Sequence, residues 1–232
     1  MALRAKGVKP EVRSRGRPVA GGAPRYERLL PAALTIFAQR GYEAANLRQI
    51  AALANVDVAL IAHRFGSKLG LWQAVVEDLA HGFVRELASR APAGDLDRML
   101  DVLVDLNCNR PEVAIFLVRE GVDNDARYEF LQQRMVKPVH DLLLPSIKAE
   151  IARLEKPPDP DFLFFALTGA LAMTVTMRPV IARFTKSTAN EDDFRDQLKS
   201  LLMVWLRAGR SMPLARQNAL SGRKTLRKES RG

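Results

Sequence analysis

The sequence has few of the residues that usually carry catalysis or metal binding. Its 232 residues include one cysteine, three histidines and 6% aromatic residues. Because Cys108 is alone, no intrachain disulfide can form, and a reducing cytoplasm is the expected compartment. The sequence contains no HExxH or CxxC spacing, no nucleophile elbow and no phosphate-binding loop. We therefore expect a protein that is not an enzyme and that needs no cofactor or metal.

Long apolar runs are also missing. The longest stretch without a charge, Phe162–Met177, has 16 residues, and a membrane-spanning helix needs about 20. The N-terminus is basic but is not followed by an apolar segment, so no signal peptide is expected. These features predict a soluble protein without a membrane partner.

The positive charge is concentrated at the two ends. The net charge is +10, with +6 in residues 1–25 and +7 in residues 207–232, which leaves −3 for the middle of the chain. Residues 1–24 and 210–232 lack apolar periodicity and are predicted to be disordered basic segments. Within the first, Arg15 and Arg17 flank a glycine and precede Pro18, as in the core of an AT-hook, which binds the minor groove of A·T-rich DNA. The alternative is a solvated tail that attracts phosphates without sequence preference.

Residues 47–68 have the pattern of a helix, a tight turn and a second helix, followed by the start of a third. Asn46, Asp57 and Ser67 are suitable N-caps, with Gln49 completing a capping box after Asn46. Asn55 stands where the turn needs a left-handed residue. Apolar residues at i, i+3, i+4 and i+7 give both helices a buried face. The second helix then presents small residues and one imidazole outward, a shape suited to the DNA major groove: Val58, Ala59, Ala62, His63 and Arg64.

The span Arg25–Val76 resembles the N-terminal DNA-binding domain of the tetracycline-repressor (TetR) family. The resemblance is carried by motifs in register: Ala32-Ala33, Phe37-Ala38, Gly41-Tyr42, Ile50-Ala51 and Phe65-Gly66-Ser67-Lys68-Leu69-Gly70-Leu71. It implies an all-α regulator that binds a palindromic operator in double-stranded DNA as a homodimer. In that reading Val58–Arg64 enter the major groove, while Arg48, Lys68 and the amides after Ser67 hold phosphates.

Three positions depart from the family pattern. Ala45 stands where a hydroxyl residue often touches phosphate, and Asn55 replaces the turn glycine. Ala62 and His63 occupy positions where a tyrosine is common in the reading helix. We expect the basic tails to supply phosphate contacts in place of those that the first and third of these positions do not make.

The remaining chain is predicted to be helical. The DNA-binding unit with its linking helix Lys68–Arg90 occupies residues 25–90, and a regulatory and dimerisation domain occupies residues 91–209, after the break at Ala91–Gly94. Proline-rich or polar breaks separate the helices that follow, and Pro138 and Pro145 predict a kink inside the third of them. These helices are Leu96–Leu106, Glu112–Gly121, Ala126–Leu154, Phe162–Phe184 and Glu191–Arg207.

The helix from Phe162 is apolar almost all round and must be covered on more than one side. Its pairing with the last helix resembles the dimer interface of the family, and this predicts six interface residues: Leu167, Gly169, Ala170, Leu198, Leu201 and Trp205. The alternative is that both helices belong to the core of one protomer. The resemblance also implies a pocket for a small hydrophobic effector, for which the candidates are Phe116, Phe130, Met135, Leu142, Phe165 and Met173.

A second functional hypothesis comes from a different class of protein. In it the chain is a helical scaffold or partner-binding module, and its basic tails contact nucleic acid without specificity. Footprinting separates the two hypotheses, because only the regulator should protect a palindrome.

Overall fold

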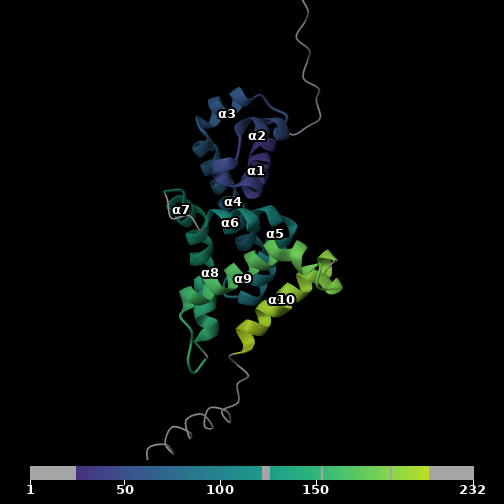
Figure 1. The fold of residues 1–232 in the computed structure, drawn as a ribbon. Helices are drawn as coiled ribbons and strands as arrows, with labels where there is room; N and C mark the ends of the chain where they lie inside the picture. The colour runs from purple at the N-terminus through teal and green to yellow at the C-terminus, as the bar shows by residue number, and fades with distance from the viewer. Residues whose placement is uncertain (1–24, 122–125, 153, 189, 209–232) are drawn as a thin grey trace, which may run out of the picture.

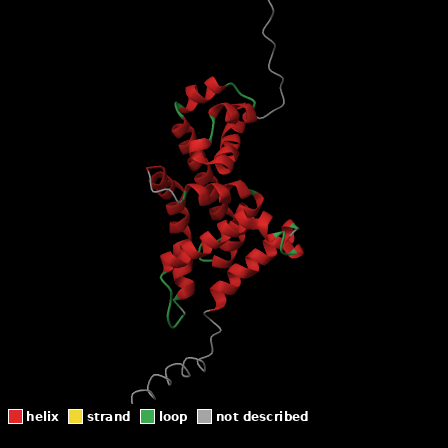
Figure 2. Ribbon diagram, in the orientation of Figure 1, coloured by secondary structure: helices red, strands yellow, loops and turns green. Residues whose placement is uncertain are grey.

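Helices are the only regular elements in the part of the chain that the structure describes, which confirms the predicted all-α class (Figures 1 and 2). The structure is a computed structural model, and it describes residues 25–121, 126–152, 154–188 and 190–208. The two basic end segments, with Arg15 and Arg17, lie outside these residues, so the AT-hook interpretation remains a prediction.

A small N-terminal unit lies at one end of the molecule (Figure 1). It is formed by a 3-10 turn and three helices: η1 (Arg25–Arg28), α1 (Leu29–Ala44), α2 (Leu47–Ala54) and α3 (Val58–Phe65). The regular helix α1 begins at Leu29, which places Pro31 in the first turn, where no helical N–H donor is needed. Gly41, with φ 74° and ψ 167°, interrupts α1 near its end.

The helix α4 (Lys68–Arg90) connects this unit to the rest of the protein (Figure 1). Its buried stripe includes Leu71, Trp72, Val75 and Leu79. These side chains belong to one hydrophobic cluster that extends from Leu29 to Leu206. The two ends of the protein therefore share a continuous core, through which a displacement in one can be transmitted to the other.

The chain after α4, which was predicted to be the regulatory domain, forms a bundle of helices, called the regulatory bundle below. Its elements are α5 (Leu96–Asn109), α6 (Pro111–Glu120), α7 (Ala126–Leu131), η2 (Gln132–Val136), α8 (Lys137–Ile151), α9 (Pro160–Ile181), η3 (Lys186–Thr188) and α10 (Glu191–Ala208).

The segment predicted as one kinked helix, Ala126–Leu154, contains a π-helical turn. This turn is η2, and it precedes Pro138 in the first turn of α8. Proline has no N–H to donate to the carbonyl four residues earlier, and its ring would collide with that carbonyl. A wider turn upstream relieves both problems. Short π segments are frequent at functional sites, and η2 packs against α4.

The helix α9 covers most of the predicted Phe162–Phe184 segment and begins two residues earlier. It extends beyond the uncharged run of 16 residues to 22 residues, and by length and composition alone it could cross a membrane. A long apolar helix of a soluble protein passes the same test, so this is weak evidence. Only 22% of its most apolar window is buried within the protein. One protomer therefore leaves most of the apolar surface of α9 uncovered.

Candidate DNA-binding surface and regulatory cavity

Side-chain caps fix both helices of the helix-turn-helix in place. The Asn46 side chain accepts a hydrogen bond from the Arg48 amide at 2.8 Å, and Asp57 accepts one from the Ala59 amide at 2.7 Å. The N-caps are thus confirmed, although Asn46 bonds the amide of Arg48 rather than that of Gln49 as the capping box requires. Asn55 has φ 55° and ψ 49°, the left-handed conformation that the turn was predicted to need.

The reading helix α3 presents the predicted face to solvent. Ile61 is fully buried and Leu60 and Phe65 are half-buried. The five outward candidates are all exposed: Val58, Ala59, Ala62, His63 and Arg64. Small and apolar side chains of this kind fit against thymine methyl groups, and an imidazole or guanidinium can reach base edges or phosphates. Arg48, in the first turn of α2, is exposed as well.

The junction between α3 and α4 depends on its glycines. Gly66 ends α3 with φ 72°, and the Ser67 hydroxyl oxygen accepts a hydrogen bond from the Gly70 amide at 3.0 Å. A Cβ atom on Gly70 would lie 2.1 Å from the carbonyl oxygen of Phe65. Only glycine therefore allows the first turn of α4 to come so close to the end of the reading helix.

Lys68 makes contacts other than the predicted one with phosphate. Its Nζ donates to the carbonyl oxygens of Tyr42, Glu43 and Ala45 at 2.9, 3.1 and 3.4 Å, and it lies 4.5 Å from the centre of the Tyr42 ring. An ammonium group has three N–H donors, and all three are used here. The sequence did not predict these contacts, because α1 ends with carbonyl groups that point at the start of α4, a relationship that no local pattern reveals; the phosphate contact of Lys68 stays a prediction.

Tyr42 is the centre of the contact between the DNA-binding unit and the regulatory bundle. Its ring stacks on Phe37 and meets the edge of Trp72, and the guanidinium of Arg127 lies 4.0 Å from its centre. Its backbone amide donates to the buried Glu120 carboxylate at 3.2 Å. Sequence reasoning found none of the partners that Tyr42 has in the regulatory bundle.

A second contact reinforces this one. The Arg119 guanidinium donates to the Gln39 carbonyl oxygen at 3.1 Å, and Arg127 forms an ion pair with Glu43 at 3.3 Å. The ends of α6 and α7 thus hold the last turn of α1, directly before the helix-turn-helix.

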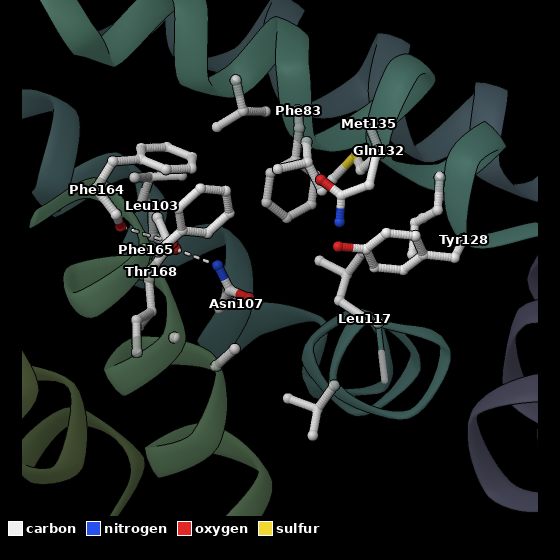
Figure 3. Close-up of a pocket in the computed structure, with 18 residues that line it drawn as sticks. Phe83, Leu103, Asn107, Leu117, Tyr128, Gln132, Met135, Phe164, Phe165 and Thr168 are labelled. Carbon is white, nitrogen blue, oxygen red and sulfur yellow. Dashed lines mark hydrogen bonds between the residues drawn. The ribbon is translucent and has the colours of Figure 1, made fainter. Parts of the chain in front are cut away.

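The regulatory bundle contains a cavity of about 370 Å³ that is partly open to solvent (Figure 3). It is bounded by residues from α4 to α9: Phe83, Leu103, Asn107, Leu117, Val118, Gly121, Tyr128, Leu131, Gln132, Met135, Val136, Val139, Phe164, Phe165, Thr168, Gly169, Leu171 and Ala172. Met135 and Phe165 were predicted correctly to lie in this region. The polar lining residues Asn107, Tyr128, Gln132 and Thr168 were missed, because they come from four separate elements.

The other four pocket candidates lie elsewhere. Phe116 and Phe130 pack against Trp72 with ring centres 6.0 Å away, as part of the core. Leu142 is half-buried on α8, and Met173 is exposed on the outer side of α9. Large apolar residues at helical spacing mark a buried face, but they do not show whether it meets a core or a cavity.

The predicted dimer residues also fall into two groups. Leu167 and Leu198 are buried against their own chain, so they are not available to a partner. Ala170 is half-buried, and Gly169, Leu201 and Trp205 are exposed. The outer face of α9 and α10 further exposes large apolar side chains that were not predicted: Phe162, Met173, Met177, Val180 and Val204.

These features define a helix-turn-helix DNA-binding protein with an attached helical regulatory domain. Residues 29–75 match the model of the "Bacterial regulatory proteins, tetR family". The chain is 41% identical over 73 residues to the HTH-type transcriptional repressor Rv3405c of Mycobacterium tuberculosis, an alignment that covers 32% of this chain and 39% of the repressor. It is 28% identical over 144 residues to the HTH-type transcriptional regulatory protein RaaS of the same organism, covering 62% of this chain and 67% of that protein.

The likeness extends to the whole fold. The structure of the regulator FadR from Bacillus subtilis, solved in complex with stearoyl-CoA, matches with a TM-score of 0.59 at 17% identity and covers 76% of this chain and 97% of that one. Residues 29–75 thus carry a domain of the tetR family, and over a longer stretch the chain is similar to transcriptional regulators. Its relatives are regulators rather than enzymes.

Proposed function

We propose that this protein is a ligand-responsive repressor that binds a palindromic operator as a homodimer. The single observation that carries the proposal is the outward face of α3, which is small, exposed and held by capped helix ends. A rigid helix of this kind can enter the major groove, and two copies related by a two-fold axis read half-sites about 34–36 Å apart. Arg48 and the amides after Ser67 are the proposed phosphate contacts, and they fix the register without reading sequence. Because it acts on DNA, we expect the protein in the cytoplasm.

The exposed side of α9 and α10 supports the homodimer. Phe162 is 71% exposed, Val204 60% and Trp205 48%. Monomeric soluble proteins rarely expose contiguous apolar surface of this kind, and a second copy of the chain would cover it. Gly169 is exposed at the edge of the cavity, where its missing side chain would let a partner helix approach α9 closely. This also accounts for an α9 that is apolar all round yet mostly unburied in one protomer.

The cavity supports the response to a ligand. The last turn of α6 lines the cavity with Leu117 and Val118, and its next two residues, Arg119 and Glu120, hold the end of α1. A ligand that moves this turn would therefore move the helix-turn-helix and change the spacing of the two reading helices. A coupling free energy of about 1–3 kcal/mol would change operator affinity about 5- to 150-fold. That FadR was solved with a bound ligand supports such a role for the regulatory domain of this fold.

The test is selection of bound fragments from random DNA, followed by footprinting of the selected sequence. We expect two protected half-sites related by a palindrome. The double variant Ala59→Glu, His63→Glu should abolish this protection, because carboxylates would face phosphates in the groove. His81→Glu is the matched control, since His81 is an exposed histidine on α4. Uniform weak protection by the natural chain, or an intact footprint with the double variant, would refute the proposal.

A further inference from the structure

We propose that the cavity of the regulatory domain takes a compact, uncharged and mainly apolar ligand with hydrogen-bonding groups at two separated positions. We therefore expect weak binding of acyl-CoA thioesters and of other organic anions whose charge would lie inside the cavity. The inference rests on the proposed ligand response and narrows the class of ligand.

The size of the cavity limits the ligand first. Its volume of about 370 Å³ is near the lower end of the range of about 300–1,000 Å³ typical of sites for small molecules. Such a space holds a ring system or a short chain. It does not hold a long acyl chain together with a nucleotide.

The second constraint concerns the charge of the ligand, because the described lining residues carry no charge. None of the eighteen described lining residues is an acid, a lysine, an arginine or a histidine. A carboxylate or phosphate enclosed here would lose its hydration without gaining a cation, which costs far more than burial of apolar surface can offset.

Three of the cations that stand next to lining residues in the sequence are engaged elsewhere. The Arg127 guanidinium lies over the Tyr42 ring and pairs with Glu43. Arg134 lies 4.0 Å from Glu77 and packs on the Phe130 ring. Lys137 pairs with Asp141 at 2.8 Å. To serve an anion in the cavity, each would have to give up a partner on the outside of the bundle.

The polar side chains of the lining occupy two separate places (Figure 3). On one side, the Asn107 Nδ2 donates to the Leu103 carbonyl at 2.8 Å and the Thr168 hydroxyl donates to the Phe164 carbonyl at 2.8 Å. Both bonds lie within the residue's own helix. They leave the Asn107 amide oxygen and the Thr168 hydroxyl oxygen as acceptors and the second Asn107 N–H as a donor, so this place offers both kinds of hydrogen bond to a ligand.

The second polar place lies across the cavity. There the Gln132 amide, on the π turn η2, and the Tyr128 hydroxyl, on α7, lie close together (Figure 3). The Gln132 amide carries two donors and an acceptor. Apolar side chains, among them Phe83, separate the two places. The lining thus matches a ligand that has an apolar body and a polar group toward each end.

A pair of fluorescent probes that differ in one charge tests the inference directly. N-phenyl-1-naphthylamine is uncharged and fluoresces in apolar surroundings, and 1-anilinonaphthalene-8-sulfonate is the same scaffold with a sulfonate. We expect the uncharged probe to saturate at one per protomer and the sulfonate to bind at least about tenfold more weakly. 1-Decanol should displace the uncharged probe, and decanoyl-CoA should not. Equal or tighter binding of the sulfonate, displacement by decanoyl-CoA, or no binding of the uncharged probe would overturn the inference.

A matched pair of variants locates the binding. Gln132→Arg puts a cation into the cavity and should reduce the preference for the uncharged probe about tenfold or more. Gln133→Arg adds the same charge one residue away, at an exposed position outside the lining, and should behave like the natural chain. If both variants shift the preference equally, the probes bind the outer surface and the inference is wrong.

The same titrations distinguish this inference from the proposed repressor function. Operator affinity is measured with and without saturating N-phenyl-1-naphthylamine. If the protein prefers the uncharged probe but its operator affinity does not change, the proposed class of ligand is supported and the proposed effect of a ligand on operator binding is refuted. If the sulfonate or decanoyl-CoA releases the DNA, the effect of a ligand on operator binding is supported and the proposed uncharged class of ligand is refuted.

Discussion

The buried carboxylate of Glu120 accepts a hydrogen bond from the backbone amide of Tyr42 at 3.2 Å. This bond joins the end of α6 to the residue that directly follows the interruption of α1 at Gly41. Leu117 and Gly121, on the same turn of α6, line the cavity. The last turn of α6 therefore faces the proposed ligand site on one side and contacts the DNA-binding unit on the other.

Replacing Glu120 should show how much this hydrogen bond contributes to the stability of the protein. Glu120→Ala removes this acceptor from the Tyr42 amide, which should cost about 1–3 kcal/mol in the free energy of unfolding measured with urea. Glu120→Gln keeps an acceptor oxygen and should lose less. Amide hydrogen exchange at Tyr42 should become faster in the alanine variant. Equal losses in the two variants would mean that the charge of Glu120 matters and the acceptor does not.

Lys68 and Arg48 are a matched pair of cations with opposite expected roles. Lys68→Met removes three hydrogen bonds to carbonyl groups at the end of α1, and it should lower the free energy of unfolding by about 1–3 kcal/mol. Arg48→Met removes an exposed charge and should change stability by less than about 0.5 kcal/mol.

Operator binding should show the reverse order. Arg48→Met should reduce the slope of log K against log salt by about one, as expected for the loss of one phosphate contact. Lys68→Met should leave that slope nearly unchanged. A reduced slope with the Lys68 variant would show that its ammonium turns outward when DNA binds.

The carboxylate of Asp105 joins three helices and gives stability a dependence on pH. It lies 2.7 Å from Arg90 on α4 and 3.1 Å from Lys199 on α10. Burial alone would raise the pKa of Asp105, but hydrogen bonds from Lys199 and Arg90 outweigh burial and hold the pKa below its ordinary value. A lowered pKa means that the ionised form stabilises the folded state above the ordinary pKa of about 3.9, and that this contribution is lost as pH falls through the lowered value.

Asp105→Asn should therefore cost about 1.5–3 kcal/mol at neutral pH, and the difference from the natural chain should shrink below about pH 4. Urea unfolding between acidic and neutral pH measures it. Asp78→Asn, at an exposed position on α4, is the control and should give a small difference. A difference for Asp105→Asn that stays constant at all pH values would contradict the assigned ion pair.

The helix-turn-helix was predictable because its determinants are local. Caps such as Asp57 and Ser67, the left-handed Asn55 and the helical spacing of apolar residues all act within a few positions along the chain, and each is present in the structure. The same reasoning placed the exposed face of α3 correctly, since burial of Ile61 leaves only one face free.

Features that depend on distant segments could not be predicted. In α9 the residues Phe164, Leu167, Leu171 and Val175 face inward, but a helix that is apolar all round gives no sign of which side meets its own chain. For this reason Leu167 was assigned to the wrong surface. The partners of Lys68 and the polar lining of the cavity likewise come from elements whose contacts only the folded chain brings together.

The outer face of α10 provides the test of the homodimer. Val204 is 60% exposed and lies beside Trp205, so Val204→Asp would place a carboxylate in a desolvated interface, a cost of several kcal/mol. Light scattering should give the natural chain about twice the protomer mass of 25.8 kDa and the variant the mass of one protomer. Leu53→Asp, at a 55% exposed leucine on α2, should remain dimeric, which controls for the loss of an exposed apolar side chain. The monomeric variant should still fold, because Val204 faces away from the core, but it should no longer protect both half-sites at once. A Val204→Asp protein that keeps the dimer mass would show that the exposed apolar face of α9 and α10 serves a different partner.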